Sequence, residues 1–70
     1  MAMEFVAQRL QMGDVILIRL PEGDREVEAT VVRAVDRTDT TVRATLMVKG
    51  RESFVQEWPL GELVTVVRGP

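Results

Sequence analysis

EVEATVVRAVDRTDTTVRATLMVK, residues 26–49, is the stretch that decides the fold of this chain. Its two flanks are rich in valine, threonine and alanine, and the polar cluster DRTD at residues 36–39 separates them. β-Branched side chains fit a pleated sheet, and clusters of Asp and Thr favour turns. The stretch therefore predicts a long β-hairpin at the centre of an all-β domain.

The positions of the apolar residues predict the register of this hairpin. With Thr38 and Asp39 at the tip, one face collects only apolar pairs. These pairs are Val35 with Val42, Val31 with Leu46, and Ala29 with Val48. The pairs on the other face are Val32 with Thr45, Ala34 with Arg43, Thr30 with Met47, and Glu28 with Lys49. Because a slip of one residue moves every side chain of one strand to the opposite face, this sorting favours a single register.

Two further strands are predicted on either side of the hairpin in sequence. Residues 15–20, VILIRL, are apolar on both faces and indicate a buried strand, and the Pro and Gly of residues 21–25 indicate a loop after it. Residues 63–67, LVTVV, form the last predicted strand. Residues 1–12 fit both a short helical stripe and a strand. We expect an extended segment there, which closes one end of the domain or pairs with a partner's sheet edge.

Another strand, predicted at residues 52–58, carries two aromatic side chains. Gly50 favours a tight turn before it. A three-residue loop at residues 49–51 would place Phe54 opposite Leu46 and Trp58 opposite Val42, with both rings facing the core. In the following PLGE, residues 59–62, the proline lacks a backbone donor and the glycine permits a sharp bend. We therefore predict a single 3₁₀ turn before the last strand.

Composition excludes several kinds of chemistry. The chain has no cysteine and no histidine, so disulfides, thiolate zinc sites and a histidine general base are absent. We expect no cofactor, no metal ion, no catalytic residue and no enzymatic activity. The formal net charge of −2 opposes non-specific attraction to nucleic acid or to an anionic membrane surface. No apolar run reaches the roughly 20 residues of a membrane span, and the N-terminus lacks the pattern of a signal peptide, so we expect a cytoplasmic protein.

The order of these elements resembles the SH3-like small barrel over residues 13–67. The resemblance is carried by Gly13-Asp14 before the first strand, by the Lys49-Gly50 turn, and by WPLGE at residues 58–62 before the last strand. The stretch VRATLMVKGRESFVQEWPLGELVTVV, residues 42–67, is also similar to short, uncharacterised actinobacterial proteins of this type. The resemblance implies one domain over residues 1–70: a five-stranded SH3-like barrel at residues 13–68, with a short N-terminal extension at residues 1–12 and the 3₁₀ turn before the last strand.

SH3-like barrels occur as peptide-binding modules, as methylated-lysine readers, and as nucleic-acid-associated or ribosome-associated domains. This chain departs from the first two groups. It has no tyrosine for a peptide groove, and Phe5, Phe54 and Trp58 are its only aromatic residues, too few for an aromatic cage. The resemblance therefore leaves the function open.

Two sets of residues are candidate binding sites. Trp58, beside the Pro-Leu-Gly turn, is either a half-exposed binding anchor or a plug for one end of the core. Together with Leu60 and Phe5 it forms the predicted protein-binding site. The second set, Arg33, Arg37 and Arg43, is either a basic patch for phosphate or a solvated face that the neighbouring aspartates neutralise.

The sequence thus predicts a small protein-interaction module with an unknown protein partner. The two ends of the chain carry more apolar residues than so small a domain can cover. We therefore consider a homodimer that forms through exposed sheet edges. The alternative is a nucleic-acid-associated or ribosome-associated accessory protein that uses the arginine set.

Overall fold

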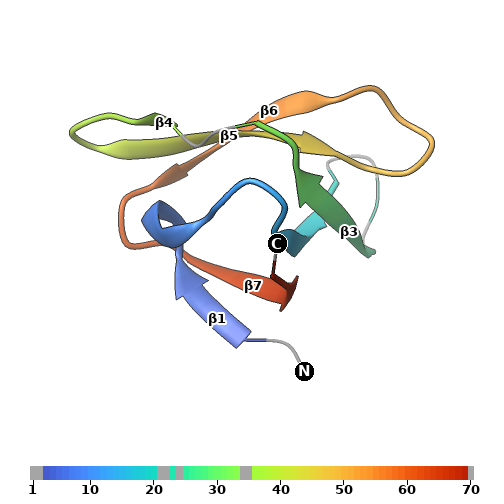
Figure 1. The fold of residues 1–70 in the computed structure, drawn as a ribbon, viewed down its shortest axis with the longest axis horizontal. Helices are drawn as coiled ribbons and strands as arrows, with labels where there is room; N and C mark the ends of the chain where they lie inside the picture. Colours follow the sequence, from blue (N-terminus) through green and yellow to red (C-terminus); the bar gives the residue numbers. More distant parts are fainter. Residues whose placement is uncertain (1–2, 21–22, 24, 34–35, 70) are drawn as a thin grey trace.

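A curled antiparallel sheet makes up most of the computed structural model, which describes residues 3–20, 23, 25–33 and 36–69 (Figure 1). The sheet bends into a half-barrel, with β5 and β6 at the top of the view and β1 and β7 at the bottom. Its strands are β1 (Met3–Val6), β2 (Val15–Arg19), β3 (Glu26–Val31), β4 (Asp36–Arg37), β5 (Thr41–Met47), β6 (Phe54–Pro59) and β7 (Leu63–Arg68). A 3₁₀ helix, η1 (Ala7–Arg9), follows β1.

The strands pair in the order β1-β7-β2-β3-β5-β4, and β6 pairs with the opposite edge of β5. The all-β class predicted from the sequence is confirmed, but the count of five strands is wrong, because the described residues form seven. One extra strand is β1, which pairs with β7 of the same chain. The other is the two-residue β4, which continues the line of β3 along β5.

The central hairpin keeps its predicted register near its base. Val31 lies opposite Leu46, and Thr30 lies opposite Met47. Both Val31 and Leu46 are completely buried, whereas Met47 is 48% exposed. Valine and leucine therefore alternate with polar and exposed side chains along this ribbon, as expected for a strand pair with one buried face.

Towards the tip, the predicted pairs are wrong for the residues that the structure describes. Val42 lies opposite Arg37 and Arg43 opposite Asp36, whereas Val35 and Ala34 had been predicted there; residues 34–35 lie outside the described residues. The tip falls one residue later than predicted because Thr38 closes the turn itself: its N–H donates to the Thr41 carbonyl oxygen at 2.9 Å, and its hydroxyl accepts the Thr41 N–H at 3.0 Å.

β3 and β4 both pair with β5, and the register of this pairing shifts by two residues from one strand to the other. Because side chains alternate with a period of two, such a step leaves the side chains of β5 on their predicted faces. Val42 is accordingly completely buried, and Arg43 is exposed. The faces predicted for Val42 and Arg43 are therefore confirmed, although their cross-strand partners are not.

The register predicted for β6 is confirmed. Phe54 lies opposite Leu46 and Trp58 opposite Val42, and both aromatic rings pack against the core. The connection between β5 and β6 covers residues 48–53, which is longer than the predicted three-residue loop. Its tight turn is closed by the Arg51 N–H, which donates to the Val48 carbonyl oxygen at 3.0 Å.

The 3₁₀ turn predicted before the last strand is wrong. β6 continues through Pro59, which lies opposite Thr41 at the end of the strand, where a missing N–H is tolerated. A β-turn follows, in which the Glu62 N–H donates to the Pro59 carbonyl oxygen at 3.1 Å and Gly61 takes a φ of +86°. The 3₁₀ helix of the described chain lies instead at Ala7–Arg9.

The N-terminal residues contribute to the core. The extended conformation predicted for them is present in β1, and η1 then turns the chain back across the sheet. Ala7 is completely buried, and Leu10 is 5% exposed. Both side chains belong to the same cluster as Ile16, Val31 and the other buried residues of the half-barrel.

Candidate functional site: an open seam along β6

The half-barrel is open along one edge of β6. No strand in the described part of the chain pairs with that edge, although β5 occupies the other. Two hollows of about 610 and 240 Å³ lie between β6 and the strands β2 and β7. Both are lined by Ile18, Arg19 and Gln56, so they adjoin one another. We call the free edge of β6 and these two hollows the β6 seam.

The backbone groups that face the seam follow from the pairing of β6 with β5. The Leu60 N–H donates to the Thr40 carbonyl oxygen at 3.0 Å, which extends the β5–β6 ladder by one pair beyond Pro59. Hydrogen-bonded pairs alternate in an antiparallel ladder, so Trp58, Gln56 and Phe54 bond to β5. The N–H and C=O groups of Val55 and Glu57 therefore point towards the seam.

The inward side chains of β6 border both hollows, and the exposed lining of the smaller one is almost entirely polar. Phe54 lines the larger hollow and Trp58 the smaller one, and both rings are partly buried. Gln56 lies between them and lines both hollows. The seam thus combines unpaired backbone groups with two aromatic rings, one neutral amide and charged side chains, among them Arg19 and Glu26.

The outward side chains of β6 are exposed but not uniformly polar. Val55 is 59% exposed. Glu57 is held by two contacts across the ribbon: its Oε2 accepts a hydrogen bond from the Thr41 hydroxyl at 3.0 Å and lies 3.5 Å from an Arg43 guanidinium nitrogen. Because both partners of this ion pair are about half exposed, it contributes little to stability but partly neutralises the Glu57 charge.

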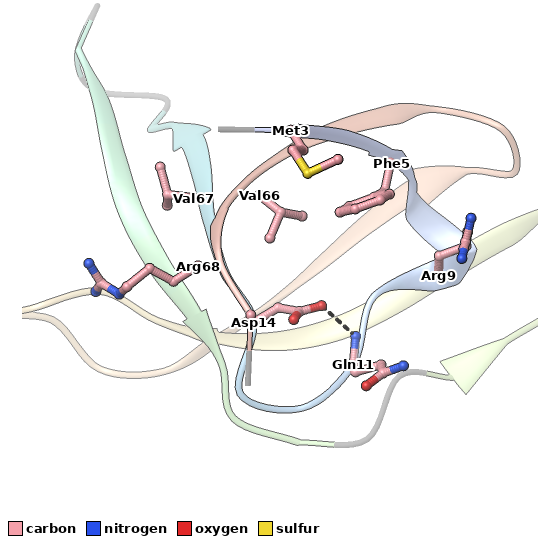
Figure 2. A pocket seen from close by; sticks show the side chains of 9 residues that line it. Met3, Phe5, Arg9, Gln11, Asp14, Val66, Val67 and Arg68 are labelled. Atoms are coloured by element: carbon pink, nitrogen blue, oxygen red, sulfur yellow. Dashed lines mark hydrogen bonds between the residues drawn. The ribbon is translucent and has the colours of Figure 1, made fainter. Parts of the chain in front are cut away.

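A third hollow of about 370 Å³, the N-terminal groove, lies beside β1, η1 and the end of β7 (Figure 2). Met3, Phe5 and Val66 give it an apolar wall, and the Arg9 guanidinium carbon lies 5.7 Å from the centre of the Phe5 ring. Asp14 lines its other side. This groove lies at the end of the sheet that carries β1.

Asp14 is a buried carboxylate with a structural role. It is 7% exposed, and its Oδ2 accepts the Gln11 N–H at 2.8 Å, the bond drawn in Figure 2. Its carbonyl oxygen accepts the Val31 N–H at 2.8 Å, and the Gly13 N–H donates to the Val31 carbonyl oxygen at 2.7 Å. Asp14 thus fixes the loop before β2 against β3. Only its position beside Gly13, before an apolar strand, hinted at this in the sequence.

The residues predicted as a protein-binding site are not brought together. Trp58 lies in the β6 seam, Phe5 in the N-terminal groove, and Leu60 on the turn between β6 and β7. Leu60 is 38% exposed. The sequence suggested that Trp58 is either a binding anchor or a plug for the core. Its position fits both, because its side chain packs on the core and also lines an open hollow.

The three arginines of the alternative site do not share a face. Arg43 lies opposite Asp36 and is ion-paired with Glu57. Arg37 lies opposite Val42, so it points to the other side of the ribbon from Arg43. Arg33 is exposed beside a shallow hollow on the outer face that also includes Met47.

Sequence reasoning missed the residues that make the seam, above all Gln56 and the backbone of Val55 and Glu57. The local sequence carries no signal for these residues, because whether an edge of β6 is free depends on how distant strands pair. Among the described residues, no group of three or more acidic side chains is placed to hold a metal ion, and no helix is long and apolar enough to span a membrane.

No protein-family model matches the chain, and no curated protein or solved structure shows a significant match to it.

Proposed function

We propose that this chain is a non-enzymatic protein-interaction module of the SH3-like barrel class, which works in the cytoplasm. The barrel assignment is supported by five strands, β2, β3, β5, β6 and β7, that follow one another in the predicted order. A long loop comes after the first of them, two hairpins follow, and a turn that begins at proline precedes the last. In this assignment β1 and the two-residue β4 are additions to the common framework.

The observation that carries the proposed function is the β6 seam. An extended segment of another protein can add to a free sheet edge, where main-chain hydrogen bonds provide affinity and side-chain pockets provide specificity. The seam offers both: free backbone groups at Val55 and Glu57, and hollows lined by Phe54 and Trp58. Partly buried aromatic residues are common anchors of protein interfaces.

A binding role also fits the chemistry of the chain better than catalysis does. A histidine or cysteine nucleophile or base is excluded by composition. The one carboxylate on β6, that of Glu57, is in contact with the Arg43 guanidinium. The described residues that line the hollows do not combine a nucleophile, a base and an orienting group within one pocket.

The proposal can be tested with peptides selected from a random library on the immobilised protein. The affinity of each selected peptide is then measured by isothermal titration calorimetry for the wild type, Gln56→Lys and Met47→Lys. Gln56→Lys places a charge in the seam, whereas Met47→Lys places the same side chain on the outer face, where Met47 is already 48% exposed. We expect Gln56→Lys to weaken binding at least about tenfold, which is roughly 1.4 kcal/mol, and Met47→Lys to leave it unchanged.

Equal affinities for all three proteins, or a loss in Met47→Lys alone, would show that the seam is not the binding surface. Mixed DNA and RNA serve as competitors at low salt. Displacement of the peptides by nucleic acid, with an affinity that falls steeply as salt is added, would favour the arginine-based alternative instead.

A further inference from the structure

We propose that the segment that pairs with the free edge of β6 is β6 of a second copy of this chain, antiparallel to the first, with the twofold axis passing beside Gln56. This inference rests on the proposed function, because it names the partner of the same seam. The dimer would continue the sheet from one half-barrel into the other. Three features of the edge, its backbone, its aromatic residues and its charges, each fit a second copy.

The backbone of the edge is self-complementary. With Gln56 opposite Gln56 of the second copy, Val55 lies opposite Glu57 of the second copy, and Glu57 opposite its Val55. Both are residues whose N–H and C=O groups face the seam, so each donates and accepts across the interface. Pro59, which has no N–H, would lie opposite Ser53, beyond the end of β6, so its missing donor leaves no gap in the ladder.

The same register brings the aromatic residues together. Phe54 lies opposite Trp58 of the second copy, and Trp58 opposite its Phe54, on the inner face of the joined sheet. Each ring is only partly buried in the single chain. Cross-strand aromatic pairs contribute stability beyond the area that they bury, so the dimer gives both rings the cover that they lack.

The charges of the edge do not oppose this pairing. Glu57 meets a valine rather than its own copy, and its carboxylate is already in contact with Arg43 and Thr41. Gln56 meets its own copy, but a neutral amide both donates and accepts hydrogen bonds, so two glutamines can pair. The edge also lacks an inward-pointing charge, a common feature by which proteins prevent such pairing.

The free edge of β1 fits a second copy less well. The Ala7 N–H donates to the Glu62 carbonyl oxygen at 2.8 Å, so the same alternation leaves the backbone of Glu4 and Val6 facing outward. β1 has four residues against six in β6. It also carries one aromatic side chain, Phe5, whose ring already lies against Arg9.

Charge complementation at Gln56 tests both the partner and the register. Sedimentation velocity at micromolar concentrations is compared for the wild type, Gln56→Glu, Gln56→Lys, and an equimolar mixture of the two variants. We expect the wild type to be a dimer. Each variant alone should raise the dimer dissociation constant at least about tenfold, because like charges meet on the axis, and the mixture should restore the dimer. Circular dichroism confirms that each variant is folded.

Proline substitutions identify the edge that is used. Val55→Pro removes an N–H that faces the seam and should abolish the dimer, whereas Glu4→Pro removes the corresponding N–H from β1 and should leave it intact. A monomeric wild type, variants that dimerise as tightly as the wild type, or a dimer lost only in Glu4→Pro would each overturn the proposal. If the wild type is monomeric but selected peptides bind and Gln56→Lys weakens them, the second copy is the wrong partner and the proposed function stands.

Discussion

Val31 and Thr30 are neighbours in β3 with opposite surroundings. Val31 is completely buried opposite Leu46, whereas Thr30 is partly exposed opposite Met47. The core is made mostly of valine, alanine, leucine and isoleucine, and no disulfide or histidine supports it. In a domain of this size the core supplies only a few kcal/mol of net stability, so one misplaced charge can outweigh it.

We expect Val31→Asp to prevent folding, because an unpaired buried carboxylate costs several kcal/mol. Thr30→Asp should lower the free energy of unfolding by about 1 kcal/mol, since aspartate is merely unfavourable in a strand. Urea unfolding, followed by the fluorescence of Trp58, measures both variants. Equal losses of stability would mean that the two faces of β3 have been assigned wrongly.

At the scale of elements, the turn between β6 and β7 depends on a backbone conformation that favours glycine. Gly61 has a φ of +86°, and a Cβ atom built there would meet no neighbour within 4 Å. Backbone strain rather than a steric clash should therefore decide the effect of a substitution. A residue of η1 also stabilises this turn: the Gly61 N–H donates to the Gln8 side-chain oxygen at 3.0 Å.

Gly61→Ala should destabilise the protein by about 1–2 kcal/mol, because an L-residue is strained at this φ. Gly69→Ala is the matched control: it also meets no neighbour within 4 Å, and its φ lies outside the left-handed range. Thermal unfolding by circular dichroism should show a lower midpoint for Gly61→Ala alone. A similar midpoint for both variants would contradict the assigned turn.

Much of each element could be predicted from sequence, because side-chain faces follow from a local period of two. Val42 and Leu46 were therefore placed inward correctly, and so were the rings of Phe54 and Trp58. The cross-strand partners of Val42 and Arg43 were not, because the position of the hairpin tip depends on how Thr38 bonds to Thr41. Pro59 was misread because a proline is acceptable at the end of an edge strand.

At the scale of the whole molecule, the N-terminal strand β1 connects the beginning of the chain to its last strand, β7. β1 pairs with β7, and the Ala7 N–H donates to the Glu62 carbonyl oxygen at 2.8 Å. Ala7 and Leu10 then fill the core from the same segment. Sequence periodicity could not predict this, nor the free edge of β6, because both depend on pairings between residues far apart in the chain.

Deletion of residues 1–10 should abolish cooperative unfolding, because it removes a strand and two core side chains from a domain with little stability to spare. Deletion of residues 1–2 alone leaves every described strand intact and serves as the control. The dispersion of amide signals in a proton–nitrogen correlation spectrum distinguishes the two. A well-dispersed spectrum from the longer deletion would mean that the remaining strands fold without β1.

The two-residue change of register between β3 and β4 also bears on how this fold can vary in length. Two residues inserted between Val31 and Asp36 would move the pairing by another full period and leave inward side chains inward. A single inserted residue would turn β4 over and bring Asp36, in place of Arg37, to the face of the ribbon that Val42 occupies. Related chains are therefore expected to differ here by even numbers of residues, so this segment can lengthen without any change in the core.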